Sequence, residues 1–282
     1  MQNILFEIHS QLSKLSPSES KVAAYILKHP RSVIEMNTAT FAQKAGVSTA
    51  TIIRFSKNIC PEGGFPALKL RLSAETEIDE RLYSEINPGD SLAVVKNKFA
   101  MRVSHTITQT NQVLSEASVQ TAVQQLTAAA TIFVYGLGAS NVVAQDFQQK
   151  FIRVGKSVVQ SLDTHLLAAG LTAQTQPTVL VLISNSGQKK DSQNLAKLAR
   201  DQQVPVIVLT HAAKSKLAKL ATTLLLHDDS EENMNTRSAA TTSLLAQLYA
   251  VDLLYYAYVA SNYHASILPI VNSHDVIGKY FD

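Results

Sequence analysis

The stretch Thr131-Ile-Phe-Val-Tyr-Gly-Leu-Gly-Ala-Ser140 joins a β-branched, apolar run to a loop of glycines and serine. A helical pattern follows it through Ala144, Phe147 and Phe151. Glycines let backbone N–H groups approach an anion, and the N-terminus of the next helix adds free donors and a partial positive charge. The stretch therefore predicts a strand, a phosphate-binding loop and a helix in succession.

Further β-branched or apolar runs follow the first, and helical patterns separate most of them. They occupy residues 157–162, 178–184, 204–210 and 222–227. Strands that alternate with helices are typical of an α/β domain with a doubly wound parallel sheet. This is the fold class that we expect for the larger part of the chain.

A second loop, Ser184-Asn-Ser-Gly187, lies at the end of the next-but-one strand after Thr131, again before a helix. Open α/β sheets bind ligands outside the carboxyl ends of their strands. Two hydroxyl-rich loops at the ends of neighbouring strands would converge on one ligand, and phosphate would suit both. The alternative is that both are ordinary glycine turns with capping serines.

A dinucleotide site is another interpretation of the first loop. Asp163 ends a strand roughly where the ribose-binding acid of a nucleotide fold would stand. The third glycine of the G-x-G-x-x-G pattern is absent, because Asn141 occupies its position. The dinucleotide interpretation also leaves the Ser184 loop unexplained.

Residues 1–77 contain several helical periods and no convincing strand, which predicts an all-α module. Ser16, Pro17 and Glu19 form a capping-box pattern, so a helix should begin near Pro17 and stop before Pro30. We expect a helical linker over residues 78–108 and the α/β domain over residues 109–282.

Within the helical module, Thr40-Phe-Ala-Gln-Lys-Ala-Gly-Val-Ser-Thr-Ala-Thr-Ile-Ile-Arg-Phe55 predicts a helix-turn-helix. Phe41 and Ala45 face inward, and Gly46 supplies the positive φ of a tight turn between helices. Ser48 caps the second helix. In that helix we expect three side chains to face the core: Ile52, Ile53 and Phe55.

Polar residues of the second helix are candidate DNA contacts. They are Ser48, Thr49, Thr51, Arg54 and Lys57. Arg54 could bond guanine through two N–H groups, and Lys57 could contact a phosphate. Because any capped helical hairpin has such residues, the alternative is that they are merely solvated.

Charge and composition limit the functional classes. Residues 1–77 hold nine Lys/Arg and six Asp/Glu, and residues 78–282 hold sixteen of each, so the helical module carries the whole net charge of +3. A basic excess in one small module suits phosphate-backbone binding. The single cysteine, Cys60, excludes an internal disulfide and a cysteine-rich zinc site.

Membrane segments are not expected. The N-terminus lacks a basic region followed by an apolar core, and the longest apolar stretch, residues 244–260, is interrupted by Gln247 and Asp252. We interpret that stretch as a buried helix and expect a soluble, cytoplasmic protein without a cofactor or metal.

Taken together, these motifs resemble the RpiR/MurR family of bacterial transcriptional regulators. The resemblance covers nearly the whole length. It rests on residues 15–19, 24–27, 45–55 and 64–69 in the helical module, and on residues 135–140, 150–155, 163–165, 183–187 and 237–243 after it. The family joins an N-terminal helix-turn-helix domain to a sugar isomerase (SIS) domain that senses a phosphosugar.

The resemblance implies a ligand site. Ser140, Ser184 and Ser186 would hold the phosphate, together with the loop glycines Gly136, Gly138 and Gly187. His165 and a glutamate would face the sugar, with Lys150 and Arg237 as further ligand candidates; the glutamate is either Glu231 or Glu232. The family's second loop usually continues S-G-x-T, and here Lys189 replaces the threonine.

The resemblance also implies a function without catalysis. We expect a regulator that binds operator DNA, responds to a hexose, hexosamine or muramic acid phosphate, and controls carbohydrate or amino-sugar metabolism genes. A homodimer or homotetramer is expected, with the helix over residues 239–263 as a candidate interface and buried core as the equal alternative.

Two other functional classes remain. A phosphosugar isomerase or lyase with a helical extension would need His165, Glu231 or Glu232 as its general base. A helical interaction module on a nucleotide-binding domain explains neither the basic excess nor the second serine loop.

Overall fold

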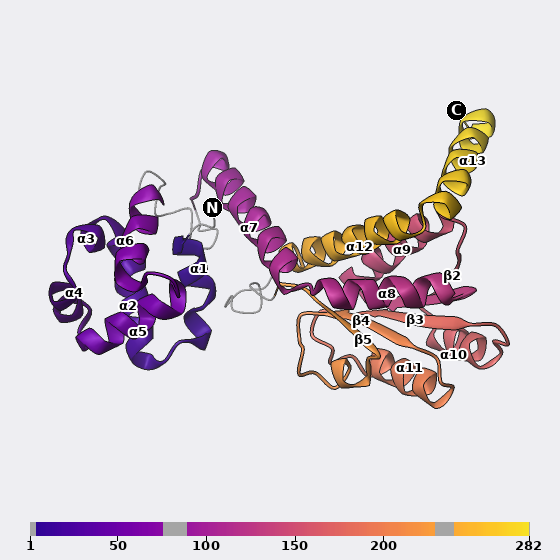
Figure 1. Ribbon diagram of the computed structural model, residues 1–282, viewed down its shortest axis with the longest axis horizontal. Helices are drawn as coiled ribbons and strands as arrows, with labels where there is room; N and C mark the ends of the chain where they lie inside the picture. Colours follow the sequence, from indigo (N-terminus) through magenta and orange to yellow (C-terminus); the bar gives the residue numbers. More distant parts are fainter. Residues whose placement is uncertain (1–3, 76–88, 229–239, 282) are drawn as a thin grey trace. The chain divides into compact units, whose positions relative to one another are not determined.

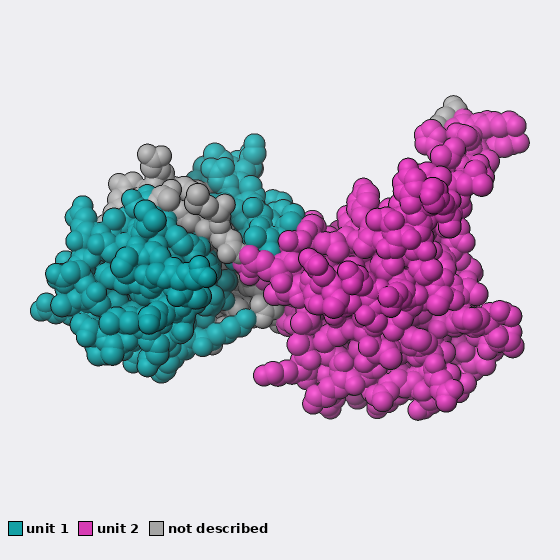
Figure 2. All heavy atoms as spheres, viewed as in Figure 1, with its two compact units in different colours: residues 1–108, 230–237 teal, residues 109–229, 238–282 magenta. Residues whose placement is uncertain are grey.

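The structure is a computed structural model that describes residues 4–75, 89–228 and 240–281. The chain divides into two compact units (Figure 2). The first comprises residues 1–108 and 230–237, and the second comprises residues 109–229 and 238–282.

The first unit is helical, as predicted. Its helices are α1 (Ile4–Ser10), α2 (Pro17–Lys28), α3 (Pro30–Glu35), α4 (Thr38–Ala45), α5 (Thr49–Ile59) and α6 (Gly64–Glu75), with a 3₁₀ turn at Leu12–Lys14. Their apolar faces form one core around fully buried side chains such as Phe41 and Phe55. The capping box is confirmed at the start of α2. The side chains of Ser16 and Glu19 each accept a hydrogen bond from the backbone N–H of the other residue.

The helix-turn-helix geometry of α4 and α5 is confirmed. Phe41 and Ala45 are buried on the inner face of α4. Gly46 ends that helix in the left-handed region, with φ +66° and ψ 38°, where a side chain would strain the backbone. Ser48 then caps α5 by accepting the backbone N–H of Thr51. The turn and the cap together fix where α5 begins.

Helix α7 (Leu92–Val113) begins in the first unit and ends in the second. It is followed by α8 (Glu116–Ala128) and a sheet of five parallel strands in the order β2-β1-β3-β4-β5. The strands are β1 (Thr131–Gly136), β2 (Ser157–Gln160), β3 (Thr178–Ile183), β4 (Val206–Thr210) and β5 (Thr223–Leu226). The five expected strands are confirmed, with ends that differ by one or two residues.

Helices cover both faces of the sheet (Figure 1). On one face α8 and α9 (Ala139–Arg153) pack on alternate strand residues such as Ile132 and Val134, and α12 (Thr242–Ser261) packs on α8 and α9. On the other, α10 (Thr164–Thr172) and α11 (Lys190–Asp201) pack on the intervening residues, such as Phe133 and Tyr135. This three-layer arrangement is the doubly wound α/β fold that the alternation of patterns predicts.

Helix α12 corresponds to the apolar stretch of residues 244–260. By length and composition alone, it is the one helix of the described residues that could cross a membrane. It packs on α8 and α9 instead, with Ala250, Leu254 and Tyr258 buried in the core. One face of α12 is therefore buried in the core, as expected of a buried helix, and its role as a subunit interface stays a prediction. A last helix, α13 (Tyr263–Phe281), follows and was not predicted.

Candidate functional site

The direction of the strand order reverses between β1 and β3. From β1 the chain moves outward to β2, whereas from β3 it moves to β4 on the other side. Gly136 and Ile183, the last residues of β1 and β3, are register partners in the parallel ladder. The loops after Gly136 and Ile183 therefore start side by side at the carboxyl edge. This switch point is where doubly wound folds bind ligands.

The first loop depends on glycine. A β-carbon at Gly136 would lie 2.2 Å from the carbonyl oxygen of Ser140, so only glycine lets the chain fold back this closely. Ser140 stands in the first turn of α9 and is buried. Its hydroxyl donates a hydrogen bond of 3.1 Å to Oε1 of Gln247 on α12. The loop is thus anchored to two helices.

The second loop starts at the same edge of the sheet, after Ile183. Ser184 is buried, and its backbone N–H bonds the carbonyl of Leu209 on β4. Ser186 is half-buried, and Gly187 packs against Ser215. Lys189 is exposed at the N-cap position of α11. The hydroxyl-bearing residues of both predicted loops are therefore brought to one edge of the sheet.

A chain of buried polar groups leads away from the first loop. Nε2 of Gln247 lies 3.4 Å from Nε2 of His227, which follows β5. Nδ1 of His227 lies 2.9 Å from the carbonyl oxygen of Asp228, whose backbone N–H bonds Oγ1 of Thr110 at 3.2 Å. The chain ends on the last turns of α7. Sequence reasoning missed its members, although Gln247 was visible as a polar break in an apolar helix.

The other candidate ligand residues are more dispersed. His165 is exposed in the first turn of α10, where Asp163 accepts its backbone N–H as the N-cap. Lys150 lies ten residues along α9 from Ser140, about 15 Å by helical rise, and forms ion pairs with the carboxylates of Asp146 and Asp252. Glu231, Glu232 and Arg237 lie outside the described residues.

The ion pairs change the titration of Lys150. Partial burial opposes its charged form, but hydrogen bonds to Asp146 and Asp252 outweigh burial and raise the pKa of the amine.

Over the part of the chain that the structure describes, no group of three or more His, Cys, Asp or Glu side chains could hold a metal ion.

The first unit presents a second candidate site on α5. Ser48, Thr49, Arg54 and Lys57 are exposed, as DNA contacts must be. Thr51 is buried, and its hydroxyl lies 3.0 Å from that of Ser48, so it belongs to the cap rather than to the outer face.

The expected orientation of Ile53 was wrong. Ile53 is 49% exposed to solvent, whereas Ile52 and Phe55 are fully buried. The buried face of α5 is centred between Thr51 and Ile52 and continues through Phe55, Ser56 and Ile59. Successive helical positions differ by about 100°, so Ile53 falls beyond the edge of that face. Ile53 therefore lies among the polar residues of α5, where an apolar side chain could meet a thymine methyl group.

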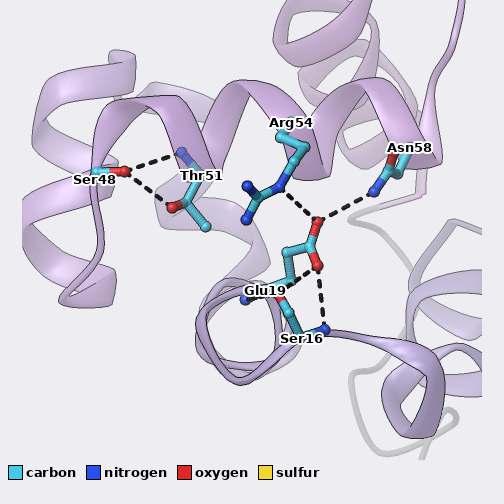
Figure 3. Close-up of polar contacts among 6 residues, drawn as sticks. All are labelled: Ser16, Glu19, Ser48, Thr51, Arg54 and Asn58. Atoms are coloured by element: carbon cyan, nitrogen blue, oxygen red, sulfur yellow. Dashed lines mark hydrogen bonds and ion pairs between the residues drawn. The ribbon is translucent and has the colours of Figure 1, made fainter.

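Glu19 of α2 contacts two residues of α5 (Figure 3). Its Oε1 accepts hydrogen bonds from Nε of Arg54 and Nδ2 of Asn58, both at 3.2 Å. The Ser16 hydroxyl bond and further donors lower the pKa of Glu19 in spite of its burial. Asn58 was not singled out from the sequence, and no local spacing links it to a residue thirty-nine positions away.

Known proteins match both parts of the chain. Residues 2–78 match the family model for a helix-turn-helix domain of the rpiR family, and residues 125–257 match the SIS domain. HexR, a helix-turn-helix-type transcriptional regulator of Escherichia coli K12, is 36% identical over 89% of this chain and 86% of its own length. YbbH of Bacillus subtilis 168, an uncharacterized regulator of the same type, is 33% identical over 92% of this chain and 91% of its own length.

Solved structures share the fold. NanR of Vibrio vulnificus, complexed with ManNAc-6P, has a TM-score of 0.61 at 24% identity and covers 98% of both chains. The sugar isomerase domain of an RpiR transcription factor from Sphaerobacter thermophilus has a TM-score of 0.57 at 18% identity, over 66% of this chain and 99% of that domain. By its matched domains and its full-length relatives, the chain belongs to the rpiR family of DNA-binding transcriptional regulators with a SIS domain.

Proposed function

We propose that the SIS domain binds a sugar phosphate at the carboxyl ends of β1 and β3, and that this ligand controls binding of operator DNA through α5. The observation that carries the proposal is the register pairing of Gly136 with Ile183, which aligns two hydroxyl-rich loops at the switch point of the sheet. NanR, a fold relative, is complexed with the sugar phosphate ManNAc-6P, which supports this ligand class.

The proposed phosphate ligands are the hydroxyls of Ser140, Ser184 and Ser186, with backbone groups around Gly136, Gly138 and Gly187. Lys189 adds a positive charge at the start of α11 in place of a threonine hydroxyl. His165 and a glutamate, Glu231 or Glu232, would face the sugar, and Arg237 is a further candidate. Lys150 is held by Asp146 and Asp252, so we propose for it a supporting role in helix packing.

The proposed mechanism is a shift of populations. A ligand that binds one arrangement of the protein better than another changes how often the DNA-binding arrangement occurs. We propose that the protein acts on carbohydrate or amino-sugar genes as a homodimer or homotetramer without catalysing a reaction. The domains would extend over residues 1–77 and 109–282, with a linker between them.

The first experiment measures the melting temperature of the full chain with hexose, hexosamine and muramic acid phosphates, and with the unphosphorylated sugars as controls. A ligand that binds the native state raises the melting temperature by mass action. We expect one phosphosugar to do so, and Ser184→Ala to abolish the shift. Lys189→Ala should weaken binding about tenfold through its lost charge, whereas the neighbouring Lys190→Ala should not.

The same ligand is then tested for turnover and for its effect on DNA binding. A change in operator affinity without product formation supports a sensor. Turnover of the sugar phosphate would support the isomerase or lyase alternative, and no shift from any phosphosugar would refute the proposed ligand class.

A further inference from the structure

The carboxylate of Glu19 serves two helices with different oxygens (Figure 3). Oε2 accepts the backbone N–H of Ser16 at 3.2 Å and the Ser16 hydroxyl at 2.5 Å, which caps α2. Oε1 accepts Nε of Arg54 and Nδ2 of Asn58 on α5. The α2 cap and the α5 contacts therefore share one side chain without competing for the same oxygen.

The two partners of the ion pair differ in exposure. The Glu19 side chain is 10% exposed, whereas the Arg54 side chain is 60% exposed. The carboxylate is thus fixed inside the first unit, and the guanidinium extends from it into solvent. A side chain as long as arginine otherwise samples many rotamers, and fixing it before binding reduces the entropy lost on binding.

The bond to Glu19 also selects which nitrogens of Arg54 can bind DNA. Guanine is recognised by two parallel N–H groups of one guanidinium plane. Nε donates to Glu19, and within residues 4–75, 89–228 and 240–281 the terminal nitrogens Nη1 and Nη2 have no hydrogen bond in the structure. The two nitrogens that remain available to a base are therefore Nη1 and Nη2, which together form the outer fork of the guanidinium.

We propose that Glu19 is a positioning residue for sequence recognition, which holds the guanidinium of Arg54 so that its outer fork meets a guanine. Glu19 also places a negative charge beside α5, which opposes binding to the phosphate backbone of DNA of any sequence. Both effects raise the ratio of specific to non-specific affinity. This inference rests on the proposed contact of α5 with operator DNA.

The test starts from a random double-stranded DNA library, from which the full-length wild-type chain selects its preferred sequence. Affinities are then measured for that sequence, for each of its single-base variants and for an unrelated duplex, at one salt concentration. The proteins are wild type, Glu19→Gln, Arg54→Ala and the double variant. Glu35→Gln is the matched control, because it removes the same charge from an exposed site at the end of α3.

We expect Glu19→Gln and Arg54→Ala to lose discrimination at the same guanine, by about tenfold. Glu19→Gln should keep or increase its affinity for the unrelated duplex, and adding it to Arg54→Ala should cause no further loss of discrimination. Glu35→Gln should discriminate as wild type does. Equal loss of affinity for every sequence, or full discrimination by Glu19→Gln, would overturn the inference.

Two further variants separate positioning from folding. Glutamine also occurs at this position of capping boxes, so Glu19→Gln should keep α2, which its melting temperature verifies. Ser16→Ala weakens the cap but leaves the bond to Arg54, so discrimination should persist. If Glu19→Gln does not fold, Arg54→Lys takes its place in the test. Lysine keeps the positive charge but cannot donate two parallel N–H groups, so this variant must lose discrimination at the same guanine. A wild-type chain that selects no sequence would instead refute the proposed DNA contact itself.

Discussion

The hydroxyl of Ser140 donates its hydrogen bond to Gln247, and both residues are buried between α9 and α12. A serine hydroxyl has a single proton. A phosphate that takes this proton must therefore displace Oε1 of Gln247, which stands at one end of the buried polar chain to Thr110 of α7. Phosphate binding at the first loop, as proposed, would thus compete with the packing of α12 for one proton.

Gln247→Leu tests this competition. It leaves the buried Ser140 hydroxyl without its acceptor, so the free energy of unfolding should fall by about 1–3 kcal/mol. The stabilisation by a phosphosugar should exceed that of wild type, because the ligand no longer competes with Gln247. Urea unfolding with and without ligand measures both. Tyr249→Phe, which removes an exposed bond to Asn111 from the same helix, is the control and should change stability by less than about 0.5 kcal/mol.

Gly136→Ala tests the close approach in the first loop. The added carbon would meet backbone atoms of Ser140 that cannot move without distorting α9, so we expect a loss of about 3 kcal/mol. Gly138→Ala meets no atom within 4 Å and bears only the backbone strain of φ +64° and ψ −127°, about 2 kcal/mol. Urea unfolding of both variants separates contact from strain. Equal losses of stability in the two variants would contradict a steric contact at Gly136.

Lys57→Gln tests the assignment of a phosphate contact on α5. Removing one such contact lowers the magnitude of the slope of log Kobs against log salt concentration by about 1 per bound chain. The loss of affinity should be the same for specific and non-specific duplexes, because phosphates carry no base identity. Lys28→Gln, at the exposed end of α2, should leave the slope unchanged. A loss confined to one base position would assign Lys57 to base recognition instead.

His105 predicts a pH dependence of stability. Burial lowers the pKa of this imidazole from its usual 6.5 to about 4. Between these values the unfolded chain binds a proton that the folded chain does not, so the free energy of unfolding falls as pH falls. Between pH 7 and pH 5, the free energy of unfolding should fall by about 2 kcal/mol.

Urea unfolding at pH 7, 6 and 5 measures this dependence. His105→Gln should make the free energy of unfolding nearly independent of pH over this range, whereas His274→Gln, at an exposed histidine, should not. Glu19 acts at lower pH, since its lowered pKa places the loss of its charge below 4.5. An unchanged curve in His105→Gln would contradict the burial of a neutral imidazole.

Local patterns predicted what depends on neighbours in sequence. The strand from Thr131, the capping box of Ser16 and Glu19, and the left-handed Gly46 each follow from side-chain or backbone preferences within a few residues. The bond of Glu19 to Arg54 joins residues thirty-five positions apart, and no periodicity encodes it. The pairing of Gly136 with Ile183 was predictable only through the general rule for sheet topology.

The place of α12 in the chain sets an order of assembly during synthesis. The last strand is complete at Leu226, yet the core on the side of α8 and α9 stays incomplete until Ala250, Leu254 and Tyr258 have been added. A nascent chain that stalls before Thr242 carries five finished strands and an apolar surface open to solvent. Such a fragment should bind chaperones or aggregate, and the second unit can reach its native packing only after Ser261 has left the ribosome.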